Sequence, residues 1–314
     1  MSLFRRAIRT FLITITAAVS LIVAIAAYFA RRVVKPPRQK LWATPDDVGL
    51  PYEDIQFPAR QDAARLSGWF VPAVNGNGKT IVMVHGWPWN RLGEAAEGLM
   101  ANVLGASAVD LLRLAHTLHH AGYNVIMYDS RNHGESAEKG GVTFGFAEAN
   151  DLLGVLDYLQ TRSDIDHKHI GVIGFSMGGN TTLYALARTD MVKAAVVVQP
   201  TSMDHFTSRL GRNLFGRFGQ IIVPLSEWMV QKMGGIPFNA VNPLYAAPAI
   251  RHTPVLFVQG QGDPWGSPAN VQEIAQATPT TVDTLLVDSR TRYEGYRYVI
   301  DHPEILTTFF ADYI

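Results

Sequence analysis

Residues 169–179 read HIGVIGFSMGG, and this stretch decides the fold. Its first seven residues form an apolar run of strand length, whereas residues 177–187 have the spacing of a helix. The two meet in a G-x-S-x-G pattern centred on Ser176, which projects a serine hydroxyl at the end of the strand and over a helix N-terminus. The alternative is a glycine-rich turn that only packs helix against strand. The context favours a nucleophilic Ser176.

Strands and helices alternate from about residue 50 onward. The segments YEDIQF and RLSGWFVP alternate apolar and polar residues, which predicts an early antiparallel pair. Apolar runs predict buried strands at residues 80–86 and 123–129, and further strands are predicted at residues 169–175, 194–199, 253–260 and 281–288. Helical spacing is found at residues 107–121, 146–159, 177–187, 268–277 and 303–313. This order predicts an α/β fold with a mainly parallel sheet flanked by helices.

A serine hydroxyl needs a general base, and the base needs an orienting carboxylate. Asp263 follows the strand at 253–260, and His302 lies beyond the last strand, so both are expected at the same sheet edge as Ser176. The predicted catalytic residues are therefore Ser176, Asp263 and His302, with Asp288 as the alternative acid. The other histidines are interpreted as packing, loop or lid residues: His85, His116, His119, His120, His133, His205 and His252.

This arrangement resembles the α/β-hydrolase superfamily over residues 50–314. Two loops strengthen the resemblance: HGW at 85–87, and DSRNHGES at 129–136, which is similar to the D-x-R-x-H-G-x-S loop of that superfamily. The resemblance implies an oxyanion hole made by the backbone N–H groups of Trp87 and Met177, and catalysis through an acyl-enzyme without a cofactor. One residue departs from the family pattern, because Asp301 stands where a glycine commonly precedes the base histidine.

Composition excludes several classes of site. The 314 residues include 27 basic and 27 acidic residues, so the balance of charge gives no sign of nucleic-acid binding. The absence of cysteine excludes disulfides, thiolate catalysis and cysteine-based zinc sites. No cluster of metal-ligating residues is apparent in the sequence, and no metal is expected.

Residues 11–30, FLITITAAVSLIVAIAAYFA, contain no charge, proline or glycine. Twenty helical residues span about 30 Å, the thickness of the hydrocarbon core of a bilayer. Basic residues flank the run on both sides, which favours an uncleaved transmembrane anchor that contacts the lipid bilayer. The alternatives are a signal peptide cleaved after Ala24-x-Ala26 and a buried core helix.

The anchor divides the chain into four parts. Residues 1–10 form a basic N-terminal region, 11–30 the anchor, 31–48 a basic linker and 49–314 the hydrolase domain. With the amino terminus counted, four positive charges precede the anchor and five follow it, which leans towards a catalytic domain on the cytoplasmic side.

Residues 201–250 interrupt the alternation and are expected to form a helical lid. Apolar residues recur every four positions in its first half, and interspersed glycines predict a broken helix. These apolar positions are Phe206, Leu210, Leu214, Phe218 and Ile222. The stripe predicts either a cap that packs on the core or a surface that admits lipid-like substrates, with Phe218 and Trp228 expected in an acyl pocket.

The sequence therefore predicts a membrane-anchored serine hydrolase, similar to esterases, lipases and serine peptidases of this fold. The expected substrates are small carboxylic esters or thioesters with uncharged, short-to-medium acyl groups. Peptide or amide cleavage by the same catalytic residues is the second hypothesis, and a non-catalytic binding protein on this fold is the third.

Overall fold

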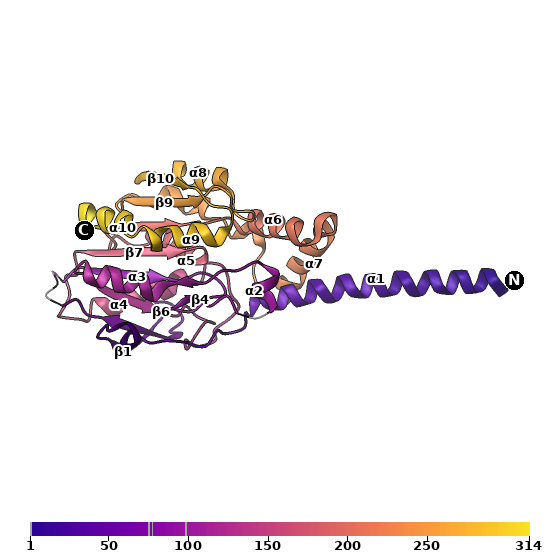
Figure 1. Ribbon diagram of the computed structural model, residues 1–314, viewed down its shortest axis with the longest axis horizontal. Coiled ribbons are helices and arrows are strands. Elements are labelled where there is room, and N and C mark those ends of the chain that lie inside the picture. The colour runs from indigo at the N-terminus through magenta and orange to yellow at the C-terminus, as the bar shows by residue number, and fades with distance from the viewer. Residues whose placement is uncertain (1, 75, 77, 98) are drawn as a thin grey trace.

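The computed structural model describes residues 2–74, 76, 78–97 and 99–314 (Figure 1). Residue 1 of the predicted basic region and residues 75, 77 and 98 of the predicted hydrolase domain lie outside this description. Within the described residues, eight strands form one sheet in the order β1-β2-β6-β3-β7-β8-β9-β10. Their bounds are β1 Glu53–Pro58, β2 Arg65–Val71, β3 Thr80–Val84, β6 Asn124–Tyr128, β7 Ile170–Phe175, β8 Ala194–Val198, β9 Val255–Gly260 and β10 Thr281–Val287.

The sheet is antiparallel only where the described strand β2 pairs with β1 and β6; the pairs from β6 to β10 are parallel. Every residue of β3, β6, β7 and β8 is buried, because helices cover both faces of the parallel part. The predicted mainly parallel sheet and the predicted antiparallel pair at its start are both confirmed.

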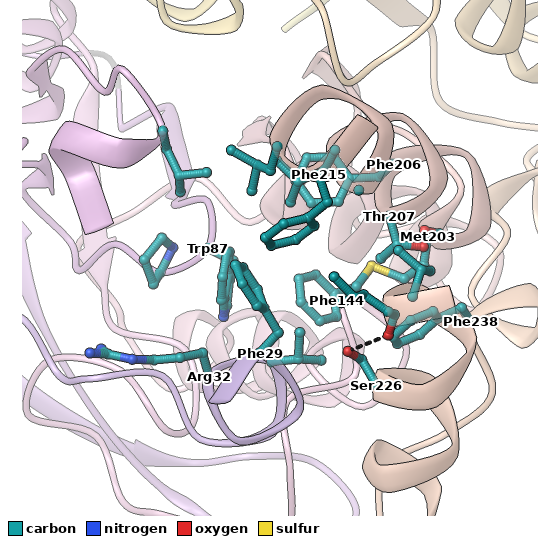
Figure 2. A pocket seen from close by; sticks show the side chains of 18 of the residues that line it. Phe29, Arg32, Trp87, Phe144, Met203, Phe206, Thr207, Phe215, Ser226 and Phe238 are labelled. Atoms are coloured by element: carbon teal, nitrogen blue, oxygen red, sulfur yellow. Dashed lines mark hydrogen bonds between the residues drawn. The ribbon is translucent and has the colours of Figure 1, made fainter. Parts of the chain in front are cut away.

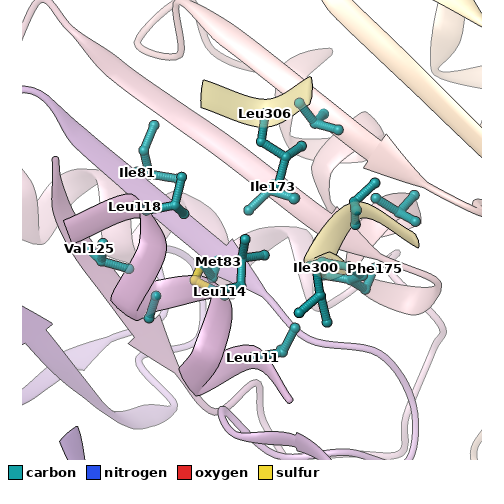
Figure 3. Close-up of a cluster of buried hydrophobic side chains, with 14 of the residues drawn as sticks. Ile81, Met83, Leu111, Leu114, Leu118, Val125, Ile173, Phe175, Ile300 and Leu306 are labelled. Carbon is teal, nitrogen blue, oxygen red and sulfur yellow. The ribbon is translucent and has the colours of Figure 1, made fainter. Parts of the chain in front are cut away.

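Two sets of helices cover the two faces of the sheet. One hydrophobic cluster joins the sheet to α3 (Leu111–His120), α9 (Arg292–Asp301) and α10 (Glu304–Tyr313). Figure 3 shows Leu111, Leu114 and Leu118 of α3 on the same side as Ile300 and Leu306. The second cluster joins the opposite face to α4 (Ala149–Leu159), α5 (Met177–Leu186) and α8 (Pro268–Ala277).

The helix α9 was not predicted. It begins after Thr291, whose side-chain oxygen accepts a hydrogen bond from the backbone N–H of Glu294 at 3.1 Å, which is an N-cap contact. Predicted helix starts at residues 107 and 146 were also too early. The first of them moves to Leu111, because Asp110 caps α3 by accepting from the N–H of Arg113. The segment before α3 holds the short hairpin β4 (Gly93–Glu94) and β5 (Val109–Asp110), and α2 (Leu99–Val103).

The lid segment, residues 201–250, is helical and broken. It contains α6 (Met203–Phe215), the 3-10 turn η2 (Gly216–Phe218) and α7 (Gly219–Lys232), followed by the 3-10 turns η3 (Phe238–Ala240), η4 (Pro243–Tyr245) and η5 (Ala247–Ala249). Gly216 has a φ of 54°, which ends α6 and confirms the predicted break. The change of direction leaves Phe218 about half exposed, at 49%, so it does not continue the apolar stripe of α6.

The N-terminal helix α1 runs from Ser2 to Val34, farther than the predicted span at each end. Its first part projects from the body, at the end of the molecule where α2, α6 and α7 lie (Figure 1). Its last turns pack on α7, where Ala26, Ala30 and Val34 recur every four residues and are buried. The helix is therefore exposed along its N-terminal part and held by the lid segment at its C-terminal end.

Candidate active site

Ser176 lies at the turn between β7 and α5, with a φ of 54° and a ψ of −113°. A non-glycine residue held in such backbone geometry is strained, and strain of this kind clusters at functional sites. The flanking glycines allow it: a Cβ on Gly178 would lie 2.2 Å from the carbonyl oxygen of Val84, and one on Gly174 would lie 2.3 Å from the carbonyl oxygen of Gly178. The predicted strand-to-helix turn is present, with its serine at the carboxyl edge of the sheet.

Two backbone amides lie beside this serine. Trp87 and Met177 line the same cavity as Ser176, and the close approach of Gly178 to the carbonyl groups of Val84 and His85 brings the two loops together. Among the described residues, neither the N–H of Trp87 nor that of Met177 has a hydrogen-bond acceptor. The arrangement can donate two N–H groups to an oxyanion, as the sequence predicts.

Two side chains contact Ser176: that of Tyr296 and that of Arg292, the first residue of α9. Its Nη2 atom lies 3.3 Å from the Oγ atom of Ser176 and 2.8 Å from the carbonyl oxygen of Gln199. Its Nη1 atom donates to Oδ2 of Asp263, and its Nε atom donates to the hydroxyl of Tyr296. Arg292 therefore stands between Ser176 and Asp263, the place of the base in a serine triad.

Asp263 is positioned as the sequence predicts, in the loop after β9. Its side chain is fully buried, and its Oδ1 atom accepts hydrogen bonds from the N–H groups of Trp265 and Gly266, each at 2.9 Å. The same carboxylate forms the ion pair with Arg292. A charge buried to this extent needs a partner, and these groups partner one another.

Arg292 keeps its proton in this environment. Burial works against the charge, but the carboxylate of Asp263 and the hydroxyl of Tyr296 outweigh it, so the pKa of the guanidinium is raised above its ordinary value. Burial also raises the pKa of Tyr296, which keeps that hydroxyl protonated. A guanidinium has donors and no acceptor. Arg292 can therefore hold positive charge against Ser176 but cannot take its proton.

His302 lies elsewhere. It caps the C-terminal end of α9, and its ring contacts the ring of Tyr298 at a centroid distance of 4.5 Å and an interplanar angle of 38°. Its side chain is 50% exposed, and its Nδ1 atom lies 3.3 Å from a carboxylate oxygen of Glu304. In the part of the chain that the structure describes, no hydrogen bond joins His302 to Ser176 or Asp263. The structure thus brings two of the three predicted catalytic side chains to one site, with Arg292 as the third.

Sequence reasoning missed Arg292, although one signal could have found it. Thr291 and Glu294 form the S/T-x-x-E pattern that marks a helix start. A helix that begins at Arg292 and continues for ten residues carries His302 about 15 Å along its axis, at 1.5 Å per residue. Asp301, which stands where the family commonly has a glycine, is the last residue of this same helix.

Two other histidines lie near the site and support loops. The Nε2 atom of His85 accepts the N–H of Ser130 at 3.0 Å, and the Nδ1 atom of His133 lies 2.8 Å from the carbonyl oxygen of Arg131. Burial lowers the pKa of His85 to about 3 and also lowers the pKa of His133. Both rings therefore stay neutral and hold the 85–87 and 129–136 loops. No group of three or more His, Asp or Glu side chains among the described residues is placed to hold a metal ion.

Ser176 opens into a narrow apolar cavity of about 40 Å³, which we call the inner cavity. Aromatic and aliphatic side chains dominate its wall, and the polar groups gather at the Ser176 end. The ring of Phe206 from α6 lies 5.5 Å from the guanidinium carbon of Arg292, so the lid segment covers the charged group. Its wall is formed by Trp87, Pro88, Trp89, Leu104, Phe144, Ser176, Met177, Asn180, Thr201, Met203, Phe206, Leu210, Trp265, Arg292, Tyr293 and Tyr296. The arrangement suits a ligand with one polar end and an apolar body.

Comparison with known proteins agrees with this architecture. A family model described as alpha/beta hydrolase fold matches residues 79–222. The uncharacterized protein YqkD of Bacillus subtilis is 28% identical over 170 residues, which cover 53% of this chain and 53% of that protein. The chain thus matches about half the length of YqkD. The alpha/beta hydrolase domain-containing protein WAV2 of Arabidopsis thaliana is 26% identical over 258 residues, covering 79% of this chain and 74% of that protein.

A solved structure extends the likeness over the whole domain. The Pyrococcus furiosus esterase Pf2001 has a TM-score of 0.68 and 24% sequence identity, over 90% of this chain and 98% of that chain. At this identity the likeness shows the fold alone. The comparisons thus agree on the fold, whereas the group beside Ser176 requires separate consideration.

Proposed function

This chain belongs to the α/β-hydrolase superfamily, and from that premise we propose that it is a membrane-anchored serine hydrolase of carboxylic esters. The observation that carries the proposal is the strained turn that aims Ser176 at the end of an apolar cavity. The unpaired N–H groups of Trp87 and Met177 beside it support an oxyanion hole. Ser176 is then the nucleophile, and an acyl-enzyme is the intermediate.

Arg292 and Asp263 take the place of a histidine and its carboxylate in this proposal. A positive charge 3.3 Å from the serine oxygen favours the alkoxide over the hydroxyl, so it lowers the cost of losing the proton to water or hydroxide. The alkoxide adds to the ester carbonyl, the alcohol leaves, and water hydrolyses the acyl-enzyme to the carboxylic acid. Because Arg292 cannot accept the serine proton and the neighbouring hydroxyl of Tyr296 stays protonated, acylation at neutral pH is slow.

The same geometry favours esters over peptides. In a serine triad the protonated histidine gives its proton to the departing amine. Arg292 holds its proton too firmly for that step, because Asp263 and Tyr296 stabilise the cation. An alcohol or thiol leaves more readily without protonation than an amine does. Esters and thioesters with an apolar acyl group are therefore the proposed substrates, and the peptidase hypothesis becomes the weaker one.

A second candidate function follows from Arg292. A guanidinium at the end of an apolar cavity can hold the carboxylate of an acyl chain through a charge-assisted hydrogen bond. Four of its five N–H donors are taken by Tyr296, Asp263, Gln199 and Ser176, so a carboxylate would share or replace the contact to Ser176. The protein would then bind an acyl carboxylate without turnover.

The proposed anchor is α1, with the predicted span at 11–30. The helix segment Leu3–Val34 is long and apolar enough to cross a bilayer, and its most apolar window is 6% buried. A signal sequence would have these properties too. The packing of Ala26, Ala30 and Val34 on α7 favours a helix that stays with the protein. With the charges counted above, we propose a catalytic domain on the cytoplasmic side.

The test compares wild type with Ser176→Ala. The full chain in detergent is treated with a fluorophosphonate reagent and with p-nitrophenyl esters of graded acyl length, and palmitate binding is measured in parallel by calorimetry. Hydrolysis and labelling that disappear in Ser176→Ala support the hydrolase. Palmitate binding without labelling or turnover in wild type supports the second candidate and overturns the first.

A further inference from the structure

We propose that a single-chain acyl ligand reaches Ser176 from the bilayer through a continuous apolar channel walled by α1 and the lid segment. The reaction at the inner end of the channel depends on the proposed function. The access of lipid to its outer end depends on the proposed anchoring of α1 in the bilayer. The channel consists of the inner cavity, a middle cavity and an outer hollow, which share wall residues.

The middle cavity has a volume of about 90 Å³ and adjoins the inner cavity. Both cavities are walled in part by Trp87, Leu104, Phe144, Phe206 and Leu210, so the boundary between them is a set of shared apolar side chains. Figure 2 shows Phe29 of α1 and Phe215 of α6 directed into this space alongside Trp87. The N-terminal helix therefore forms part of the wall of the space next to Ser176.

The outer hollow continues the path along α1. Phe29, Leu214 and Phe215 line both the middle cavity and the outer hollow, which is also bounded by Ala24 and Tyr28. The rings of Phe29 and Phe215 meet edge to face, with centroids 5.4 Å apart. Toward the N-terminus, residues 3–21 of α1 are exposed, a length of about 28 Å at 1.5 Å per residue. The hollow thus lies beside α1 immediately after its exposed part.

Contacts beyond α1 fix this wall relative to the site. The Nε atom of Arg38 donates to the carbonyl oxygen of Gly134 at 2.9 Å, and its Nη2 atom donates to the carbonyl oxygens of His133 and Ser136. The carbonyl oxygen of Val34 accepts the N–H of Val142 at 3.0 Å. The end of α1 is therefore joined to loops of the hydrolase domain and does not swing as on a free linker.

The polarity of the path orients its ligand. Polar groups gather at Ser176 and Arg292, whereas the middle cavity and the outer hollow are mainly lined by aromatic and aliphatic side chains. In Figure 1 the parallel strands point toward the lid segment and the base of α1, so the site edge faces the expected bilayer. The carboxyl or ester end of the ligand lies at Ser176, and its tail points back toward the lipid. A fatty acid or a simple ester of one fits a single path of this kind.

The experiment uses the full chain in phosphatidylcholine nanodiscs and a palmitate probe with a photoreactive diazirine near the end of its tail. After irradiation, mass spectrometry locates the labelled residues. The expected labels fall on residues 24–33 of α1 and 206–215 of α6, and unlabelled palmitate competes with them. Contact with bulk lipid alone would place the label on residues 3–21 only, or would give label that palmitate does not displace. Either result would overturn the proposal of a channel.

Two variants sharpen the result. Leu214→Trp adds bulk where the middle cavity meets the outer hollow, and it is expected to lower competable labelling about tenfold, since each excluded CH₂ changes affinity about fourfold. Phe218→Trp, on the exposed turn η2, is the matched control and should retain the label. Equal labelling in both variants, with thermal unfolding that shows both are folded, contradicts the channel. Labelling without ester hydrolysis would instead reject the proposed function and leave the channel standing.

Discussion

The Nη2 atom of Arg292 lies 3.3 Å from the Oγ atom of Ser176, and its Nη1 atom donates to Asp263, so the guanidinium bridges the two side chains as the histidine of a serine triad would. The predicted nucleophile Ser176 and the predicted acid Asp263 therefore lie on either side of a cation that cannot act as a base. We therefore expect the rate of ester hydrolysis to be limited by the positive charge of Arg292, although the serine itself is present.

Replacing Arg292 by histidine should increase ester hydrolysis. An imidazole between Ser176 and Asp263 can accept the serine proton, and general base catalysis contributes about 10²- to 10⁴-fold. We expect kcat/KM for p-nitrophenyl acetate to rise by about 10²-fold or more, as measured by release of p-nitrophenol. The double variant Arg292→His/Ser176→Ala is the control and should lose the gain. If Arg292→His is folded and its kcat/KM does not exceed that of wild type, Arg292 does not occupy the position of a general base.

The pH dependence of wild-type hydrolysis should lack a histidine step. The pKa of Arg292 is raised, because Asp263 and Tyr296 outweigh the effect of burial, so its charge does not change between about pH 6 and about pH 9. The pKa of His85 is lowered to about 3, so this ring is neutral over the same range. The rate should instead rise steadily with pH as the serine alkoxide forms. A plateau with a midpoint near pH 6.5 in wild type would indicate a histidine base.

His302→Ala tests the base that the sequence predicts. The side chain is half exposed and contacts Glu304 and Tyr298, so its loss should change kcat/KM less than about twofold and stability by less than about 0.5 kcal/mol. Hydrolysis of p-nitrophenyl butyrate and thermal unfolding measure the two effects. A loss of about 10³-fold with an unchanged melting temperature would restore His302 as the base and require α9 to rearrange.

Much of the fold could be predicted, because strand and helix periodicities are local. The buried strand β8 is a continuous apolar run, β7 and β9 are largely apolar, and the turn at Ser176 is a short motif. The break in the lid segment was also predictable from Gly216. The exposure of Phe218 could not be predicted in this way, because the direction of α7 after the turn η2 depends on packing against α1.

The site was predicted in part for the same reason. Asp263 directly follows a strand, so the strand end determines its place. The residue that meets Ser176 depends instead on the unpredicted helix α9, whose first residue is Arg292 and whose C-terminal cap is His302. The stretch RTRYEGYRY has little apolar periodicity, so its helical character rests on the Thr291 cap and on burial of Tyr293 and Tyr296 against the sheet.

Asp263→Asn should destabilise the protein strongly. It leaves the buried charge of Arg292 without its carboxylate, and breaking a buried ion pair from one side costs about 3–5 kcal/mol. For a domain of this size the melting temperature should fall by about 6 °C or more. Asp288→Asn, at the exposed alternative acid, is the matched control and should change stability by less than about 0.5 kcal/mol. Equal melting temperatures for the two variants would mean that Arg292 is not held by Asp263.

Truncation separates anchoring from packing in α1. The full chain should remain in membrane pellets after carbonate washing, with its N-terminus intact. A chain beginning at Ile22 lacks the exposed part but keeps the packing of Ala26, Ala30 and Val34, so it should be released from the membrane and melt at the same temperature as the full chain. A chain beginning at Leu41 also loses that packing and the contacts of Arg38. It should melt about 5 °C lower or more and should aggregate, because the apolar face of α7 is uncovered.

Release of the full chain by carbonate, or a mature N-terminus near Ala27, would reject the anchor. Equal melting temperatures for the two truncated chains would mean that α1 does not support the lid segment.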